Sequence, residues 1–407
     1  MPSHGNIAVF QAYHSLQIHT LNVVKYLRES GYSVDLFLLF QDGIHVQYVN
    51  LQENQIFDYS DCSPSWKSQT NILKRNLGAL RYYVIEPILS KFLIPNIVLK
   101  RTKEQLAKKQ YVCFIGVEKN GLVWAGLMGK IFKIPYLYYS LELYTDEYYA
   151  FTRPHKRLRF WRTRQLEKRF HPGAHATIVQ DEVRGTVLMK SNNVKTMQNI
   201  YLPVSIAGKP IFQKSDLLHE KFHISKKKRI ILQFGLITGA RLSDKIAEAV
   251  QHIDNKWVIV FHGAVTEEGI IDRIKKINSN NNIILSTDLI ASSLIDEIIE
   301  SVDIGLCFYD NKVQNDFHTG FSSEKLARYL QCGIPVIAFD YPTFKLSVEK
   351  NKCGVCIKGL DELPIAIQKI ENDYNRYREN AFKTYRSTFE FKCQFKKVLN
   401  FIDHLEA

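Results

Sequence analysis

The sequence contains no hydrophobic run long enough to cross a membrane, no internal repeat, and no low-complexity tract beyond short lysine runs. Its apolar segments at 131–139 and 334–339 fall far short of the roughly 20 residues that a spanning helix needs. No early stretch has the three regions of a signal peptide, because the apolar residues 7–10 are followed at once by Gln11 and His14. We therefore expect a protein that is neither secreted nor inserted across a membrane.

The cysteines lack any pattern of a disulfide framework. Seven of them are scattered through 407 residues, which favours free thiols in a reducing cytoplasm. Cys353 and Cys356 form a C-x-x-C pair, but a zinc site would need a second pair or histidines at ligand spacing nearby. We interpret both as structural cysteines on a strand, and we expect no metal site.

Positive charge is in excess and is concentrated in two segments. The formal net charge is +13, with nine basic residues in segment 71–110 and eight in segment 153–170. In the first of these segments the cations alternate with aromatic and aliphatic side chains, as in a helix that lies on a membrane surface. We expect both segments to contact an anionic membrane, although a solvated helix face would have the same composition. Since no zinc knuckle, helix-turn-helix pattern or RNP-like aromatic strand is present, we expect no nucleic-acid partner.

Alternating buried strands and helices predict an α/β protein with two doubly wound, Rossmann-like domains. A chain of this length also exceeds one compact core. Pro203, Gly208 and Pro210 interrupt the pattern at the join. The expected domains are 1–204 and 205–387, facing across a cleft, with a C-terminal helix at 388–407 that packs back on the first domain. The expected strands are 6–10, 32–40, 112–117, 135–139, 230–234, 257–262, 282–286, 304–308 and 335–339.

Segment 320–339, GFSSEKLARYLQCGIPVIAF, joins a loop of small residues, a helix and a buried strand. Ser322 and Ser323 can cap the helix, and free backbone N–H groups at its start would attract an anion. Gly333 ends the helix. The segment therefore has the layout of a phosphate-binding turn, and an ordinary αβ unit without a ligand would have the same layout.

Three segments of the chain share their pattern with one group of enzymes. Segment 322–336, SSEKLARYLQCGIPV, resembles a donor-site helix with its G-x-P-V exit, and segment 233–241, QFGLITGAR, resembles the first strand and loop of a donor domain. Segment 134–144, IPYLYYSLELY, resembles the stretch that often ends in H-E-L-Y beside the reacting sugar. Together they resemble the GT-B-fold glycosyltransferases, especially the retaining, nucleotide-sugar-dependent group called family 4. The resemblance covers nearly the whole chain.

The resemblance implies a donor site in the second domain. Breaking the anomeric bond to a diphosphate requires stabilisation of growing phosphate charge, which this family achieves with a helix N-terminus and cationic side chains, without a metal or another cofactor. Gly235 would let the backbone approach the donor closely, and Arg241 falls where the family places a diphosphate-binding lysine. A solvated loop arginine is the alternative for Arg241. The remaining donor-site candidates are Ser322, Ser323, Glu324 and Lys325.

The first domain would bind the acceptor. Glu142 follows the strand at 135–139, where it could orient an acceptor hydroxyl or accept its proton, with Asp146 and Glu147 as competitors close in sequence. A surface loop residue is the alternative reading of Glu142. His14 and Ser15 follow the first strand, where the relatives bring a loop against the diphosphate and the acceptor. A structural role for His14 stays open.

The sequence departs from the family at several positions. The family has two glutamates eight residues apart on the donor loop and helix, where this chain has Gly320 and Arg328. Ribose recognition by the second carboxylate is therefore in question. Leu236 stands where many relatives have an arginine, so that Lys325 could supply the missing phosphate contact. Leu141 stands where a histidine often precedes Glu142.

The function implied is that of a glycosyltransferase, metal-independent and retaining, which uses a UDP- or GDP-linked sugar. Its acceptor would be a lipid-linked glycan or a polysaccharide in surface-glycan synthesis, and the protein would lie peripherally on the cytoplasmic face of the membrane. A sugar-nucleotide epimerase is a second interpretation, and the scarcity of paired carboxylates in the matched loops argues against it. A non-catalytic GT-B partner of another transferase is a third, which the missing glutamates and histidine keep open.

Overall fold

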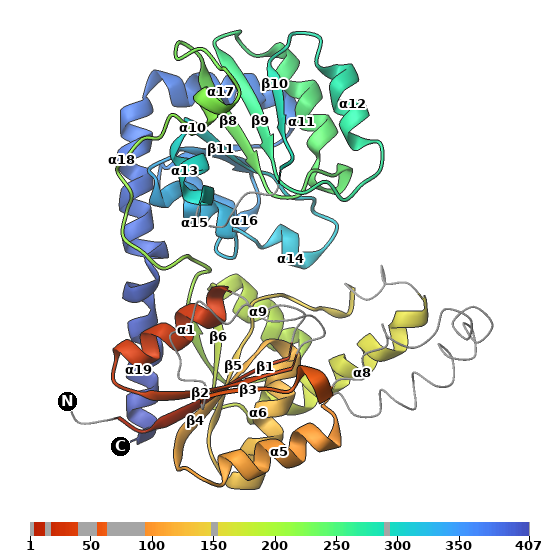
Figure 1. Cartoon of the computed structure of the whole chain (residues 1–407), viewed down its shortest axis with the longest axis vertical. Coiled ribbons are helices and arrows are strands. Elements are labelled where there is room, and N and C mark those ends of the chain that lie inside the picture. The colour runs from red at the N-terminus through yellow and green to blue at the C-terminus, as the bar shows by residue number, and fades with distance from the viewer. Residues whose placement is uncertain are drawn as a thin grey trace. The chain divides into compact units, whose positions relative to one another are not determined.

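The computed structural model describes residues 4–12, 18–39, 55–62, 94–147, 154–288 and 294–406 (Figure 1). The chain divides into two compact units. The first comprises Met1–Leu202 together with Gln394–Ala407, and the second comprises Pro203–Cys393. The division lies close to the boundary after residue 204 that the sequence predicts.

The first unit is built on a seven-stranded parallel sheet with the strand order β3-β2-β1-β4-β5-β6-β7. Its strands are β1 (Asn6–Gln11), β2 (Ser33–Leu38), β3 (Ile56–Asp58), β4 (Tyr111–Val117), β5 (Tyr136–Tyr139), β6 (Ala176–Val179) and β7 (Gln198–Tyr201). Its helices are α1 (Ile18–Glu29), α5 (Asn96–Leu106), α6 (Glu118–Phe132), α8 (Pro154–Phe170), α9 (Glu182–Ser191) and α19 (Phe391–Glu406). Helices α1 and α19 cover one face of the sheet, whereas α5 and α6 cover the other (Figure 1).

Aromatic packing holds the centre of this unit. Phe10 on β1 stacks on Phe37 of β2 at 4.9 Å between ring centroids and meets the edge of Phe114 on β4 at 5.4 Å. Tyr26 and Tyr32, on and after α1, contact α19, where Asp403 accepts a hydrogen bond from the Tyr32 hydroxyl at 2.5 Å. These contacts attach the C-terminal helix α19 to the first unit.

The second unit has a six-stranded parallel sheet with the order β10-β9-β8-β11-β12-β13. Its strands are β8 (Arg229–Phe234), β9 (Trp257–His262), β10 (Ile283–Ser286), β11 (Ile304–Cys307), β12 (Val336–Phe339) and β13 (Gly354–Ile357). Its helices are α10 (Leu217–Lys221), α11 (Ser243–Ala249), α12 (Ile270–Ile277), α13 (Ile295–Glu300), α14 (Gln314–Phe317), α15 (Glu324–Gln331), α16 (Pro342–Phe344), α17 (Leu363–Asn372) and α18 (Tyr374–Thr384).

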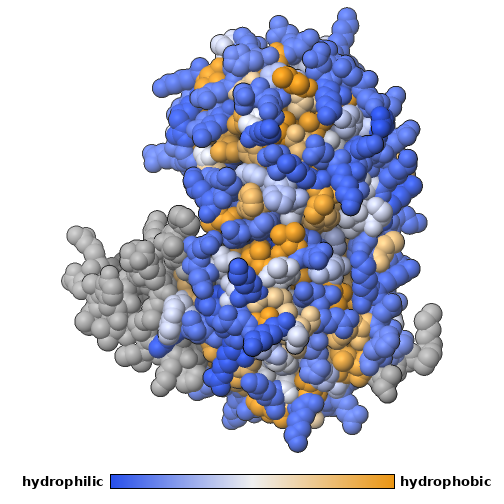
Figure 2. Space-filling view, turned by 180° about the vertical axis from the view of Figure 1, so that it is seen from behind, coloured by the Kyte–Doolittle hydropathy of each residue, from blue (hydrophilic) through white to orange (hydrophobic). Residues whose placement is uncertain are grey.

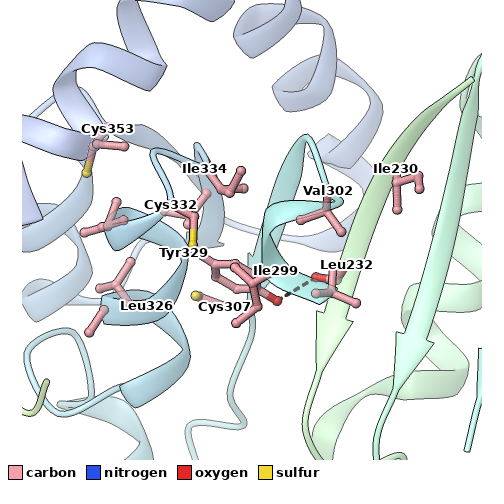
Figure 3. Packing of buried hydrophobic residues seen from close by; sticks show 14 of the residues in the cluster. Ile230, Leu232, Ile299, Val302, Cys307, Leu326, Tyr329, Cys332, Ile334 and Cys353 are labelled. Atoms are coloured by element: carbon pink, nitrogen blue, oxygen red, sulfur yellow. Dashed lines mark hydrogen bonds between the residues drawn. The ribbon is translucent and has the colours of Figure 1, made fainter. Parts of the chain in front are cut away.

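Helix α15 is anchored on this second sheet by its buried face (Figure 3). Leu326 and Tyr329 pack into the hydrophobic core, and the Tyr329 hydroxyl donates a hydrogen bond to the Leu232 carbonyl of β8 at 2.9 Å. Cys307 and Cys332 lie in the same cluster, and Gly333 ends the helix with a positive φ of 66°. Helix α15 is therefore packed against the sheet beside β8 and β11.

Two doubly wound parallel sheets confirm the fold class that the sequence predicts. Hydrophilic residues dominate the face shown in Figure 2, and hydrophobic residues appear between them in small groups. None of the described helices is both long and apolar enough to cross a membrane. Strands β3, β6 and β7 were not among the predicted strands, whereas β13 contains Cys356, which the sequence places on a strand.

Candidate active site

Gly235, at the carboxyl end of β8, has the backbone conformation that the donor-site prediction requires. Its φ is +115°, which L-residues with a side chain rarely adopt, and a Cβ placed there would meet no atom within 4 Å. Its N–H donates to the His262 carbonyl at 2.9 Å, which fixes the turn against the end of β9. Open space therefore lies in front of the Gly235 backbone, where a ligand could approach it.

Arg241 and Lys325, far apart in sequence, meet on one aromatic ring. The Arg241 guanidinium carbon lies 5.3 Å from the ring centroid of Tyr309, and the Lys325 ammonium nitrogen lies 4.4 Å from the same centroid. Asp316 on α14 accepts from Arg241 at 3.4 Å. One carboxylate thus faces two cations, so that the cluster keeps an excess of positive charge for an anionic ligand.

The environment of the cluster weakens the positive charge of Lys325 in the absence of a ligand. Burial lowers the pKa of Lys325 to about 8, and the nearby charge of Arg241 acts in the same direction. Burial also raises the pKa of the Tyr309 hydroxyl, which therefore keeps its proton. An anion bound beside Lys325 would restore its full charge by attraction.

Ser323 caps helix α15, as the sequence predicts. Its side chain accepts a hydrogen bond from the Leu326 N–H at 3.2 Å, and it is also 2.7 Å from the Tyr309 hydroxyl. Ser322 contacts Thr319 through the two hydroxyls at 3.3 Å, and Glu324 accepts from Arg328 at 2.8 Å. Ser323 and the two cations therefore contact Tyr309, whereas Glu324 contacts Arg328 on its own helix.

Two positions where the family has glutamates are occupied by other contacts. Gly320 donates its N–H to the Thr343 hydroxyl at 3.0 Å, and a Cβ there would lie 2.4 Å from the Thr343 backbone. Arg328 is held between Glu324 at 2.8 Å and Asp296 at 2.7 Å. The first site has no room for a carboxylate, and the second presents a cation that is already paired with two acids.

A groove of about 660 Å³ opens beside Tyr309, on the side of α11. Its volume lies within the range of small-molecule sites. Residues from α11 and from the loops after β11, β12 and β13 line it, among them Lys245, Asp310, Phe339, Tyr341 and Lys358. The second unit therefore has space for a ligand next to the cation cluster.

Glu142 in the first unit lies on a loop that three buried side chains hold in place. Glu118, the first residue of α6, accepts the N–H groups of Leu141 at 2.6 Å and of Glu142 at 2.9 Å through its oxygen Oε1. The loop carbonyls are held in turn, since Gln180 donates to Ser140 at 2.6 Å and Arg184 donates to Leu141 at 2.7 Å. Glu142 itself is half-buried at the carboxyl end of β5.

Asp146, a competitor of Glu142 in the sequence, has a structural environment. Its carboxylate lies 3.0 Å from both Arg164 and Lys168. Partial burial opposes its charged form, but these two cations outweigh the burial and lower the pKa of Asp146. Glu147 is exposed. Of the candidate carboxylates, Glu142 is thus the one held by a buried hydrogen-bonded support.

The basic segment 153–170 forms helix α8, and one of its arginines does not face a membrane. The Arg164 side chain is only 1% exposed, and its guanidinium bonds to Glu167 at 3.0 Å and also to Asn192. Arg164 therefore does not contribute to an exposed basic surface. The charge pattern cannot distinguish an arginine with a buried partner from a solvated one, and membrane contact of the segment stays a prediction. Segment 71–110 is described from residue 94 onward, and His14 and Ser15 lie outside the described residues.

Sequence reasoning missed Glu118, Gln180, Arg184 and Tyr309. A signal for Glu118 was present, because the pair Glu118-Lys119 follows directly after a buried strand, at the sheet edge where ligands collect. Gln180 and Tyr309 likewise follow the ends of β6 and β11. Arg184 had no such signal, since a helix arginine three residues after an acidic cap is usually solvated.

Residues 246–390 match the family described as Glucosyltransferase 3-like, C-terminal domain. No curated protein sequence is significantly similar to the chain. Sucrose-phosphate synthase from Thermosynechococcus elongatus is a similar solved structure, with a TM-score of 0.70 and 13% identity over 99% of each chain. HepE from Anabaena, solved with UDP and glucose, has a TM-score of 0.66 and 13% identity over 98% of this chain and 100% of its own. WaaG, a glycosyltransferase involved in lipopolysaccharide biosynthesis, has a TM-score of 0.61 and 14% identity over 96% of this chain and 98% of its own.

These similarities establish the fold of the chain. Two Rossmann-like domains with the strand orders given above are the GT-B architecture, and the structural matches extend over nearly the whole chain. The resemblance to GT-B glycosyltransferases is therefore confirmed, and the family match falls inside the second unit. The roles of individual site residues stay predictions.

Proposed function

We propose that the protein is a glycosyltransferase that moves a sugar from a UDP- or GDP-linked donor to a lipid-linked glycan or a polysaccharide in surface-glycan synthesis. One observation carries the proposal. Arg241, Lys325 and the Ser323-capped start of α15 converge on Tyr309 at the carboxyl edge of the second sheet. Such an arrangement suits a diphosphate, because it combines helix N–H groups with two cationic side chains.

The reaction would use the two units for different tasks. The acceptor hydroxyl oxygen forms a bond to the anomeric carbon, while the bond from that carbon to the diphosphate breaks and its electron pair leaves with the phosphate oxygen. Arg241 and Lys325 would stabilise the charge that grows on this oxygen. Glu142 would orient the hydroxyl or accept its proton. Retention of configuration and independence of a metal are parts of the proposal that rest on the family resemblance.

A panel of nucleotide sugars tests the proposal. Because HepE was solved with UDP-glucose, this donor comes first, followed by other UDP- and GDP-sugars. We expect binding in isothermal titration, together with slow release of free nucleoside diphosphate when water replaces the acceptor. Failure to bind any nucleotide sugar would overturn the proposal.

A non-catalytic GT-B partner protein is the second candidate. The observation in its favour is that Gly320 and Arg328 replace two family glutamates and are fully engaged with Thr343, Glu324 and Asp296. Donor binding without release of nucleoside diphosphate, with every acceptor tried, would favour this candidate over the transferase.

Peripheral membrane binding is a further part of the proposal. Trp161 on the basic helix α8 is 56% exposed, and an exposed tryptophan among cations suits the boundary between lipid headgroups and acyl chains. The chain should pellet with vesicles of phosphatidylserine and phosphatidylcholine at low salt and less so at high salt. Trp161→Ala should reduce pelleting, and absence of pelleting on the anionic vesicles would contradict the membrane role.

A further inference from the structure

Glu118 occupies a position that a glutamate ordinarily avoids. It lies directly after β4, at the same sheet edge as Glu142, and its side chain is only 2% exposed. Its φ is +59°, in the left-handed region that disfavours residues with a side chain. Such backbone conformations persist where the surrounding structure demands them, and they concentrate at functional sites.

The Glu118 carboxyl group makes an asymmetric set of contacts. Oxygen Oε1 accepts from two successive N–H groups, those of Leu141 and Glu142. The other oxygen, Oε2, is buried, and none of the described residues gives it a hydrogen-bond partner. One oxygen thus holds the loop that carries Glu142, while the second is withdrawn from water.

The charges around Glu118 oppose its ionisation. Burial raises the pKa of Glu118 to about 8, and the neighbouring carboxylate of Glu142 acts in the same direction. Lys119 and the two N–H groups act in the opposite direction. Burial raises the pKa values of Tyr138 and Tyr139 on β5, and the charge of Glu118 acts in the same direction. The raised pKa favours the protonated form of Glu118, in which Oε1 still accepts the two N–H groups.

We propose that Glu118 is a positioning residue for the transfer reaction, because its Oε1 fixes the Leu141–Glu142 backbone and thereby sets the direction of the Glu142 carboxylate. Gln180 and Arg184 hold the carbonyl side of the same loop, so Glu118 is its anchor on the N–H side. The inference rests on the proposed function of Glu142. It adds a residue that acts through another and that touches no reacting atom.

The substitution Glu118→Gln separates this role from direct participation. A glutamine keeps the oxygen that accepts both N–H groups and places its amide nitrogen at Oε2, whereas Glu118→Ala removes both. We expect Glu118→Gln to keep kcat within about threefold of the wild type, and Glu118→Ala to lower kcat at least about tenfold with donor KM nearly unchanged. Glu300→Gln, at a buried glutamate of the second unit with a raised pKa, is the matched control and should leave kcat unchanged.

The pH profile gives a second readout. Wild-type turnover should fall above pH of about 8, because ionised Glu118 repels the Glu142 carboxylate and turns it away, although its Oε1 still holds the Leu141 and Glu142 N–H groups. Glu118→Gln should lack this descending limb. Equal losses of kcat in the glutamine and alanine variants, or full activity of the alanine variant, would overturn the proposal.

Hydrogen exchange tests the positioning role without turnover, so that its failure can be told apart from failure of the proposed function. The amides of Leu141 and Glu142 should exchange faster in Glu118→Ala than in the wild type, and should stay protected in Glu118→Gln. Wild-type protection of both amides in Glu118→Ala would overturn the inference, whatever reaction the enzyme performs.

Discussion

The carboxyl edges of the two sheets are built alike but present different ionisable groups. In the second unit the edge presents Arg241 and Lys325 around Tyr309, with Asp316 as a partial counterion. In the first unit the edge presents Glu118 and Glu142, close enough for each to affect the ionisation of the other. Under the proposed function, the same topology would serve an anion in one unit and hydroxyl groups and protons in the other.

The two edges also differ in how their functional side chains are supported. The cations are held against one aromatic ring, and Arg241 is held by Asp316 as well. The backbone of the Glu142 loop is instead held by hydrogen bonds with the side chains of Glu118, Gln180 and Arg184. We infer that ligand attraction dominates at one edge and exact placement of a reacting group at the other. Substitutions at the two edges should therefore have different kinetic signatures.

The largest effect is expected for Glu142→Gln. If Glu142 orients the acceptor or accepts its proton, turnover should fall by about 10²- to 10⁴-fold, whereas the dissociation constant of the donor should stay within about twofold. Steady-state release of nucleoside diphosphate and isothermal titration measure the two quantities. Glu147→Gln, at an exposed carboxylate of the same loop, is the control and should behave as the wild type. A loss of donor affinity in Glu142→Gln would show that the two edges do not divide their tasks in this way.

Arg241→Gln should produce the reverse pattern. Loss of a charge-assisted contact to the diphosphate should weaken donor binding about 10- to 100-fold. The matched control is Arg376→Gln. It removes an exposed arginine of α18 that is paired with Asp373. If both variants bind the donor as tightly as the wild type, Arg241 is a loop arginine that pairs with Asp316 and does not contact the donor.

Much of the fold could be predicted from the sequence because its strands are buried runs with sharp ends. Both ends of α15 were also predictable. Ser323 caps its start and Gly333 follows its end with a positive φ, as is typical of these residue types. Strand β7 escaped prediction because Gln198–Tyr201 contains no run of apolar residues, and β6 (Ala176–Val179) escaped although it is as long as the predicted β5. Their assignment depends on neighbours in the sheet, which no local pattern contains.

The candidate site was only half predictable, for a physical reason. Residues within one segment, such as Glu142 or Ser323, follow from their place after a strand or before a helix. The contacts of Arg241 and Lys325 with Tyr309 join three segments of the chain. The hydrogen bond from the Leu141 N–H to Glu118 joins two. Such contacts are tertiary. The sequence indicates Lys325 as a replacement for a missing arginine. It does not indicate that Lys325 and Arg241 contact the same Tyr309 ring.

Lys325 makes the cationic edge sensitive to pH. Because its pKa lies at about 8, below the ordinary 10.5, the free protein loses this charge in mildly alkaline solution while Arg241 keeps its own. The dissociation constant of UDP, measured by titration, should rise by up to about tenfold per pH unit above that pKa. Lys325→Arg should bind UDP with little change over the same range. An equal pH dependence in the wild type and the arginine variant would assign the effect to another group.

The smallest effect is expected for Ser323→Ala, and it separates the helix cap from the cations. Loss of the cap should lower the free energy of unfolding by about 1 kcal/mol. The melting temperature of the second unit should fall by about 2–4 °C in calorimetry. Donor affinity should fall less than in Arg241→Gln, because the helix N–H groups and both cations remain. Ser323→Thr keeps a capping hydroxyl and should restore most of the stability. A loss of donor affinity larger than that of Arg241→Gln would mean that the hydroxyl itself, rather than the cations, is the main contact to the diphosphate.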